Sequence, residues 1–324
     1  MKYLVVHTDP RLHPPSQGQL DLLHELDAEM EARDCYTSED VVSLAGEADV
    51  VIAPAAPVSA AMIGRLGRCR LIAKMGTGYD NIDAAAAGRA GIFVTNVPEF
   101  CTADVADHTI GLLLDSVRKI SRSDREVRNG LWNPAGVLPT SRLEHKILGL
   151  VGYGKIARAV VQRALGFGLR ILAYDPYVPG EAMQTDKVEA CEDLGSLLSI
   201  ADVVSLHVPL TDHTRHIIGE RELDLMKPDA VFINCARGAL VDEPALVRAL
   251  AEGKIAGAGL DVLAKEPPDE DHPLLAMENV VVTPHSAAFS NDAMRDLRRQ
   301  VYEEVARVLC GETPQNIVNR EWLP

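Results

Sequence analysis

Short apolar runs alternate with segments of helical period along the first hundred residues. The apolar runs have the composition of buried strands, and the segments between them place apolar residues three or four positions apart. This alternation is typical of a parallel sheet whose strands are joined by helices. The expected strands are Tyr3–His7, Asp49–Ala53, Leu71–Lys74 and Ile92–Thr95, and the expected helices are Gln19–Glu31, Ser59–Leu66 and Ile82–Arg89.

A second series of apolar runs begins after residue 100. Its six expected strands are Ile147–Val151, Arg170–Tyr174, Asp202–Val208, Ala230–Asn234, Gly257–Leu260 and Val280–Thr283. Two long amphipathic helices, Thr102–Ile120 and Asn291–Leu309, lie where the two series meet. We therefore expect an α/β protein with two doubly wound parallel-sheet lobes. A Rossmann-type cofactor domain (101–289) would be inserted into a discontinuous substrate domain (1–100 and 290–324).

Composition narrows the class of partner. The chain has 324 residues, which suits two domains, and its net charge of −15 argues against nucleic acid or an anionic membrane as a partner. The six cysteines show neither a C-x-x-C pair nor metal-ligand spacing, so we expect reduced thiols and no metal. The apolar stretch at the start is shorter than a signal peptide requires, and no run reaches the length of a membrane span. A cytoplasmic protein is expected.

The segment from Ile147 to Asp175 carries a dinucleotide-binding pattern. A strand leads into a turn with Gly152 and Gly154, a helix follows, and a second strand ends at Asp175. Gly152 permits the tight turn, and Gly154 lets a pyrophosphate approach the backbone at the positive end of the helix. A carboxylate at Asp175 can accept hydrogen bonds from an adenosine ribose. The alternative, a βαβ unit without a ligand, is disfavoured because strand, turn, helix and acid occur together in the required order.

Three polar residues each follow an expected strand. They are Arg237, Glu266 and His285. A guanidinium binds a carboxylate through two hydrogen bonds, an imidazole transfers a proton near neutral pH, and a carboxylate beside the imidazole fixes its tautomer. Singly, each has a plainer interpretation as a surface charge, a solvated loop acid or a turn residue. Together, at the carboxyl ends of strands, they predict a catalytic group.

A glycine-rich turn in the first lobe could bind an anion. Gly76, Thr77 and Gly78 follow an expected strand, and consecutive backbone N–H groups there would suit a carboxylate. The alternative is an ordinary strand-to-helix loop in which Asn81 or Asp83 caps the helix.

These motifs in combination resemble the D-isomer-specific 2-hydroxyacid dehydrogenases. The resemblance runs from about Ala53 to Phe289 and rests on GTGYDNID, CTADVADHTIGLLL, GLVGYGKIA, INCARGALVDE, GLDVLAKEP and TPHSA. The stretch VPEFCTADVADH looks closest to the branch that includes the C-terminal-binding-protein corepressors. The resemblance implies NAD as cofactor and a small 2-oxo or 2-hydroxy acid as substrate, and we expect a homodimer.

The resemblance also assigns roles to residues. Arg237 would bind the substrate carboxylate and carbonyl, His285 would give or take the proton, and Glu266 would be its partner. The amides around Gly76–Gly78 would form a second carboxylate clamp. The remaining cofactor contacts would be Lys155 and Ile156 at the pyrophosphate, Asp175 at the ribose, Thr102, Cys235 and Asp261 about the nicotinamide, and His207 and Pro209 on the adenine side.

Other functions stay open at this point. An NAD(H)-sensing corepressor-like scaffold with little turnover would keep the same Arg, Glu and His. Formate dehydrogenases are disfavoured, because that branch pairs its histidine with Gln where this chain has Glu266. Phosphoglycerate-type members usually carry an arginine in the segment that here reads Ala53-Pro54-Ala55-Ala56-Pro57, so a phosphorylated substrate is disfavoured.

Overall fold

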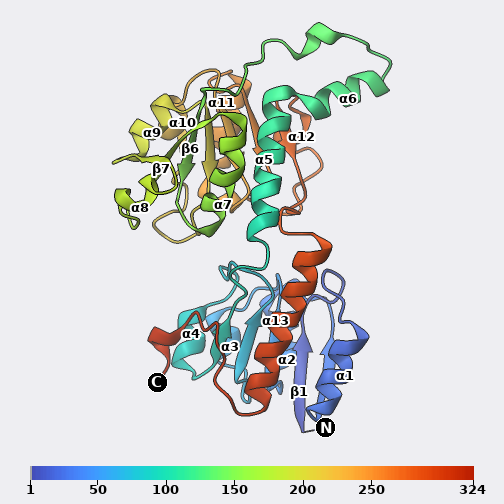
Figure 1. The fold of residues 1–324 in the computed structure, drawn as a ribbon. Coiled ribbons are helices and arrows are strands. Elements are labelled where there is room, and N and C mark those ends of the chain that lie inside the picture. The colour runs from blue at the N-terminus through green and yellow to red at the C-terminus, as the bar shows by residue number, and fades with distance from the viewer. Residues whose placement is uncertain (1) are drawn as a thin grey trace. The chain divides into compact units, whose positions relative to one another are not determined.

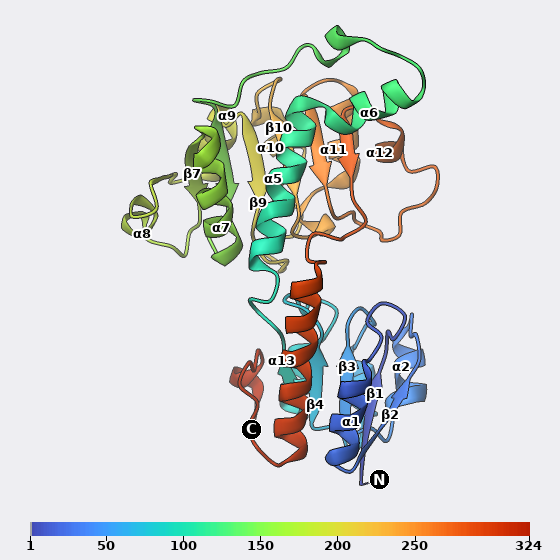
Figure 2. The same cartoon turned by 45° about the vertical axis from the view of Figure 1, so that its right-hand side comes forward.

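The computed structural model describes residues 2–324, which form two compact units (Figures 1 and 2). Unit 1 comprises the chain up to Phe100 together with Ser290–Pro324, and unit 2 comprises Cys101–Phe289. Each unit is built on one parallel sheet with helices on both faces, which confirms the expected α/β class. Among the described residues, no helix is both long enough and apolar enough to cross a membrane.

Unit 1 contains a five-stranded sheet in the order β2-β1-β3-β4-β5. Helices α1 and α13 share one buried cluster with the sheet, and α2, α3 and α4 share the other. The strands are β1 (Tyr3–His7), β2 (Ala28–Ala32), β3 (Val50–Ala53), β4 (Leu71–Lys74) and β5 (Phe93–Thr95). The helices are α1 (Gln17–Glu25), α2 (Ser38–Ala45), α3 (Ala60–Ile63), α4 (Ala84–Arg89), α13 (Asn291–Leu309) and the 3₁₀ turn η4 (Arg320–Trp322).

Unit 2 contains a seven-stranded sheet in the order β12-β11-β10-β9-β6-β7-β8. Helices α5 and α7 lie over one face, and α9, α10 and α11 lie over the other (Figure 2). The strands are β6 (Ile147–Val151), β7 (Arg170–Tyr174), β8 (Val188–Ala190), β9 (Val203–Leu206), β10 (Val231–Asn234), β11 (Gly257–Leu260) and β12 (Val280–Val282). The helices are α5 (Thr102–Arg118), α6 (Ile120–Arg128), α7 (Lys155–Ala164), α8 (Gly180–Gln184), α9 (Leu194–Ile200), α10 (Glu220–Leu225), α11 (Glu243–Ala251), α12 (Pro273–Ala276) and the 3₁₀ turns η1 (Pro134–Val137), η2 (Leu165–Phe167) and η3 (Gly238–Leu240).

Two edge strands are absent from the sequence prediction. The helix expected over Gln19–Glu31 is wrong beyond Glu25, where α1 ends; Asp27 then adopts a left-handed backbone with φ 55° and the chain enters β2. The six strands expected after residue 100 are seven, because β8 extends the sheet beyond β7. Both missed strands carry glutamates on exposed positions, so neither forms the continuous apolar run of a central parallel strand.

One buried amide side chain links the last residues of the chain to the rest of unit 1, beside a backbone hydrogen bond from Val318 to Val94. Asn319 is fully buried, and its Oδ1 accepts the N–H of Val94 at 2.9 Å. Its Nδ2 donates to the carbonyls of Ile92 at 2.9 Å and Ala84 at 3.2 Å. This side chain therefore satisfies backbone groups at the edge strand β5 and at the start of α4.

Asn319→Ala should destabilise unit 1 by about 2–4 kcal/mol, because it leaves buried backbone groups without partners. Chemical denaturation measures the loss, and hydrogen exchange at the Val94 amide should accelerate. Glu321→Ala, an exposed change in the same tail, should stay within about 0.5 kcal/mol of the unaltered protein. Equal stability of the Asn319 and Glu321 variants would contradict this account of the tail.

Candidate active site

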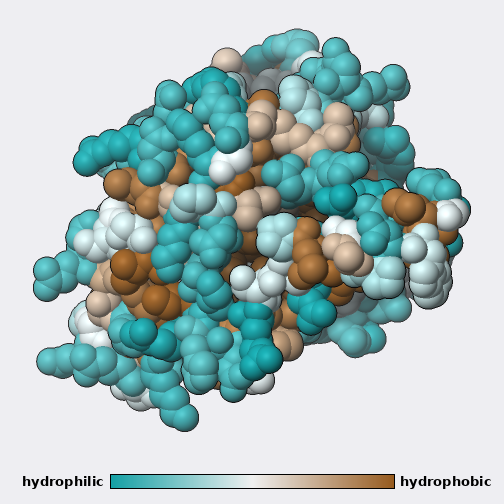
Figure 3. Space-filling model, turned by 90° about the horizontal axis from the view of Figure 1, so that it is seen from above, coloured by the Kyte–Doolittle hydropathy of each residue, from teal (hydrophilic) through white to brown (hydrophobic). Residues whose placement is uncertain are grey.

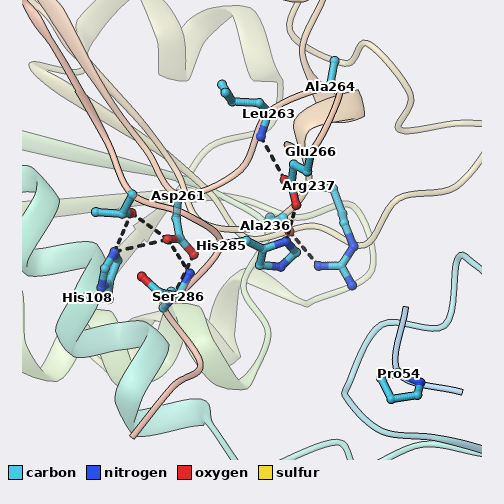
Figure 4. A network of polar contacts seen from close by, with 12 residues as sticks. Pro54, His108, Ala236, Arg237, Asp261, Leu263, Ala264, Glu266, His285 and Ser286 are labelled. Carbon is cyan, nitrogen blue, oxygen red and sulfur yellow. Dashed lines mark hydrogen bonds and ion pairs between the residues drawn. The ribbon is translucent and has the colours of Figure 1, made fainter. Parts of the chain in front are cut away.

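Three adjacent strands of unit 2 end beside one another and carry the proposed catalytic residues. The pairs β10–β11 and β11–β12 are parallel, so their carboxyl ends lie at the same edge of the sheet. Arg237 follows β10, Glu266 follows β11 and His285 follows β12. Figure 4 shows the three side chains close together beyond these strand ends.

His285 and Glu266 form a close hydrogen-bonded pair. Nδ1 of His285 lies 2.6 Å from Oε2 of Glu266, and the two side chains are 46% and 37% exposed. Because an ionised carboxylate only accepts hydrogen bonds, Nδ1 carries the hydrogen and Nε2 is the nitrogen left for a substrate. Burial acts to raise the pKa of Glu266. The hydrogen bond and charge of His285 outweigh burial, with help from the N–H of Leu263 and the charge of Arg237, so this pKa lies below its usual value.

The turn that presents Arg237 is fixed by a buried asparagine. Asn234, 1% exposed, accepts the N–H of Ala236 at 2.9 Å and donates to the carbonyl of Arg237 at 2.9 Å. Nη1 of Arg237 donates to the carbonyl of Ala236 at 2.7 Å. The next residue must be glycine, because a Cβ on Gly238 would lie 2.0 Å from the carbonyl oxygen of Leu263. The turn after β10 therefore packs directly against the loop that leads to Glu266.

The Glu266 loop is anchored a second time from α11. Oε1 of Glu266 accepts the N–H of Leu263 at 3.0 Å, and the neighbouring N–H of Ala264 donates to Oε2 of Glu243 at 2.8 Å. The other oxygen of Glu243 lies 3.0 Å from Nε2 of His272. Backbone and side chain of this loop are thus held at several points, which limits the positions that Glu266 can take.

The dinucleotide-type turn follows β6, as the sequence predicts. Gly152 has φ 93°, and a Cβ there would lie 2.7 Å from the carbonyl oxygen of His207. No atom lies within 4 Å of the Cβ position of Gly154, which directly precedes α7. Lys155 and Ile156 form the first turn of α7. The combination of a crowded first glycine and an open second glycine at a helix N-terminus fits a bound pyrophosphate.

Asp175 is held over this turn by backbone donors. Its Oδ2 accepts the N–H of Tyr153 at 2.8 Å, and its Oδ1 accepts the N–H of Tyr177 at 2.9 Å. The nearby guanidinium of Arg158 bonds Asp186 at 2.6 Å and lies 4.4 Å from the ring centre of Tyr153. Asp175 therefore stands at the end of β7 with a fixed orientation, while Arg158 is engaged elsewhere.

The other expected cofactor residues are distributed over unit 2. Thr102 begins α5, and Pro209 lies in the loop after β9. Burial lowers the pKa of His207 to about 4, so its imidazole is neutral near pH 7. Burial raises the pKa of the Cys235 thiol to about 12. Asp261, which follows β11, is 1% exposed and accepts hydrogen bonds from the loop that carries His285.

Gly76, Thr77 and Gly78 lie in unit 1, beyond the carboxyl end of β4. Thr77 donates its hydroxyl to the carbonyl of Val97 at 2.9 Å. Asp83 caps α4 by accepting the N–H of Ala86, so the capping role considered for Asp83 is confirmed.

Sequence reasoning missed the residues that hold these loops in place. Asn234 and Gly238 lie inside the motif INCARGALVDE, but only their contacts distinguish them from neighbouring residues. The pattern contains no signal for Glu243, because its partner loop is distant in sequence. In the part of the chain that the structure describes, no group of three or more His, Cys, Asp or Glu side chains is placed to hold a metal ion.

Comparison with known proteins agrees with this geometry. Residues 110–287 match the family described as D-isomer specific 2-hydroxyacid dehydrogenase, NAD binding domain. A D-3-phosphoglycerate dehydrogenase of Methanocaldococcus jannaschii is 40% identical over 99% of this chain, which spans 60% of that protein's length. A glyoxylate reductase of Korarchaeum cryptofilum is 42% identical over 82% of this chain and 80% of its own length.

A solved structure shows the same fold. The glyoxylate reductase from Paecilomyes thermophila superposes with a TM-score of 0.87 at 29% identity, covering 99% of this chain and all of that chain. The chain therefore belongs to the D-isomer-specific 2-hydroxyacid dehydrogenases, and its residues 110–287 are the NAD-binding domain of that family.

Proposed function

We propose that the protein transfers a hydride between NAD(H) and a small 2-oxo acid or its D-2-hydroxy acid. The observation that carries this proposal is the hydrogen-bonded pair of His285 and Glu266 beside Arg237, at the ends of three adjacent strands. A proton donor, its orienting carboxylate and a carboxylate-binding cation are the groups that reduction of a 2-oxo acid requires. The hydrogen bonds of the loops that carry these three residues limit the positions that their side chains can take.

The residues of unit 2 fit NAD. The open Gly154 position at the start of α7 suits a pyrophosphate, and the fixed carboxylate of Asp175 suits a ribose diol. When bound, NAD supplies or accepts the hydride. Lys155, Ile156, Thr102, His207, Pro209, Cys235 and Asp261 stay predictions as its further contacts.

His285 would move the proton. With its Nδ1–H directed at Glu266, the neutral ring presents a bare Nε2 that can take the hydroxyl proton during oxidation. The protonated ring presents Nε2–H and can donate to the carbonyl oxygen during reduction. Glu266 would keep the ring in one orientation through this hydrogen bond.

Arg237 would bind the substrate carboxylate and polarise the neighbouring carbonyl, because its planar guanidinium offers donors in a fixed geometry. Gly76, Thr77 and Gly78 stay a prediction as a second clamp for that carboxylate.

The surroundings of the Ala53–Pro57 segment support a substrate without phosphate. Its amides at Ala55 and Ala56 already donate to the carboxylate of Asp9, at 3.2 and 3.3 Å. Lys74 donates to the carbonyl of Pro54 and to Asn81. The carboxylate of Asp9 thus occupies amides that could otherwise bind an anion.

Two arginines that lie near this segment in sequence are directed elsewhere. Arg65 pairs with Glu39 at 2.9 Å, and Arg68 pairs with Asp49, which precedes β3 at the opposite end of the strands. No residue of the Ala53–Pro57 segment itself is a cation.

A homodimer and a cytoplasmic location also stay predictions. Five apolar side chains are exposed along α6 and the segment that follows it: Ile120, Val127, Leu131, Trp132 and Leu138. Figure 3 views the molecule from above, the side on which α6 lies in Figure 1, and shows apolar groups among hydrophilic ones. A second copy of the chain would cover such a surface in a dimer, and the mass of the protein in solution measures whether it forms.

The enzyme should use NADH in preference to NADPH, because Asp175 would face the added phosphate with like charge. We expect kcat/KM to be lower with NADPH than with NADH, by a ratio that corresponds to about 1–3 kcal/mol. Asp175→Asn, which keeps an oxygen for the Tyr153 N–H, should improve the use of NADPH. Glu189→Gln removes an exposed carboxylate of β8 and should leave the preference unchanged. Equal kcat/KM for the two cofactors in the unaltered protein would contradict the assignment of Asp175.

Substitutions of the three catalytic candidates should have different effects. His285→Ala should lower kcat by roughly 10²–10⁴-fold, whereas Arg237→Ala should also raise KM for the oxo acid. Glu266→Gln keeps an oxygen that can accept from Nδ1 of His285 but removes its charge, so kcat should fall more than NADH binding weakens. Steady-state kinetics across pH measure all three, with exposed His24→Ala as the control. Near-normal turnover by His285→Ala would refute this mechanism.

Oxidation of NADH should be fastest with small, non-phosphorylated 2-oxo acids. Each missing charge-assisted contact to a phosphate costs about 1.5–3 kcal/mol, so kcat/KM for 3-phosphohydroxypyruvate should be roughly tenfold or more below that for hydroxypyruvate or glyoxylate. A clear preference for the phosphorylated compound would overturn this choice of substrate. NADH binding without turnover on any 2-oxo acid, pyruvate and bulkier acids included, would favour the scaffold function instead.

A further inference from the structure

A second histidine–carboxylate pair lies behind the loop that carries His285. His108 projects from α5, and its Nε2 lies 2.9 Å from the hydroxyl of Thr283 and 3.4 Å from Oδ1 of Asp261. The side chain of Asp261 is 1% exposed, whereas that of His108 is 25% exposed. Figure 4 shows this group on the other side of the loop from Glu266 and Arg237.

The direction of each hydrogen bond in this group follows from the chemistry of its members. The Thr283 hydroxyl lies 2.6 Å from Oδ1 of Asp261, and a carboxylate can only accept, so the hydroxyl donates to it. The hydroxyl oxygen is then the acceptor for His108, and Nε2 of His108 must carry a hydrogen. A chain of donors thus runs from His108 through Thr283 to Asp261.

Asp261 in turn fixes the backbone at the catalytic histidine and at the two residues that follow it. Its carboxylate accepts the N–H groups of Ser286 and Ala287, both at 2.9 Å, and its carbonyl accepts the N–H of His285 at 2.8 Å. His285 has φ 52°, a left-handed conformation that is strained for a non-glycine residue. The loop keeps this conformation because its amides converge on the carbonyl and carboxylate of one buried residue.

We propose that His108 is a positioning residue for the hydride-transfer reaction. It holds Thr283 and Asp261 in the arrangement that keeps the His285 loop in its left-handed turn. This inference rests on the proposed function, since it assigns His285 the proton transfer. Glu266 orients the ring of His285 through Nδ1, whereas His108 acts on the backbone beneath it.

The test compares substitutions that keep or remove the donor at Nε2. His108→Leu should lower kcat by about tenfold to a hundredfold, because a small misplacement of a catalytic group is costly. His108→Gln, whose amide nitrogen can donate to Thr283, should restore most of this loss. The dissociation constant of NADH, measured by fluorescence titration, should change far less than kcat. His24→Leu on the exposed face of α1 is the matched control and should leave kcat unchanged.

A double-substitution cycle covers the outcome in which His108→Leu folds poorly. Thr283→Val should reproduce the loss of kcat, and adding it to His108→Gln should remove the rescue, because the amide then has no acceptor. Turnover by His108→Leu close to that of the unaltered enzyme would overturn the inference, as would a loss that Gln does not restore. If the unaltered protein does not oxidise NADH with any 2-oxo acid, it is the proposed function that fails.

Discussion

The parallel pairing of β10, β11 and β12 is the constraint on which the candidate site depends. Parallel neighbours end at one edge of the sheet, so the loops that follow them must emerge side by side. Each of these loops delivers one residue of the proposed catalytic group. Strands β10 and β11 are buried throughout and β12 is buried in part, where α5 and α11 cover them. Their packing therefore determines the spacing of Arg237, Glu266 and His285.

Contacts between loops turn this coarse placement into a defined geometry. Gly238 allows the turn after β10 to pack against the carbonyl of Leu263, so the loops of Arg237 and Glu266 cannot move apart independently. Asp261, at the end of β11, binds the amides that follow His285. The loop after β11 thus contacts both of its neighbours. Most of these contacts involve backbone atoms, which hold position better than flexible side chains do.

The sequence predicts those parts of the fold that depend on continuous apolar runs. Strands β6, β7 and β11 begin and end at the expected residues, since the interiors of parallel strands are continuous apolar runs. The edge strands β2 and β8 escape prediction because glutamates interrupt them. The catalytic candidates could be predicted because each lies in the loop that follows a strand. His108 could not, because its partner Thr283 is distant in sequence and only the packing of α5 brings them together.

The measurement that tests the account most directly is a crystal structure of the protein with NAD and oxamate, an unreactive analogue of a 2-oxo acid. The account predicts that the carbonyl oxygen of oxamate lies within hydrogen-bond distance of Nε2 of His285, with its carboxylate at Arg237 and the bond from Nδ1 to Glu266 retained. Oxamate bound away from His285, or a His285 ring that has turned from Glu266 to present Nδ1, would contradict the central claim that these residues form the catalytic centre.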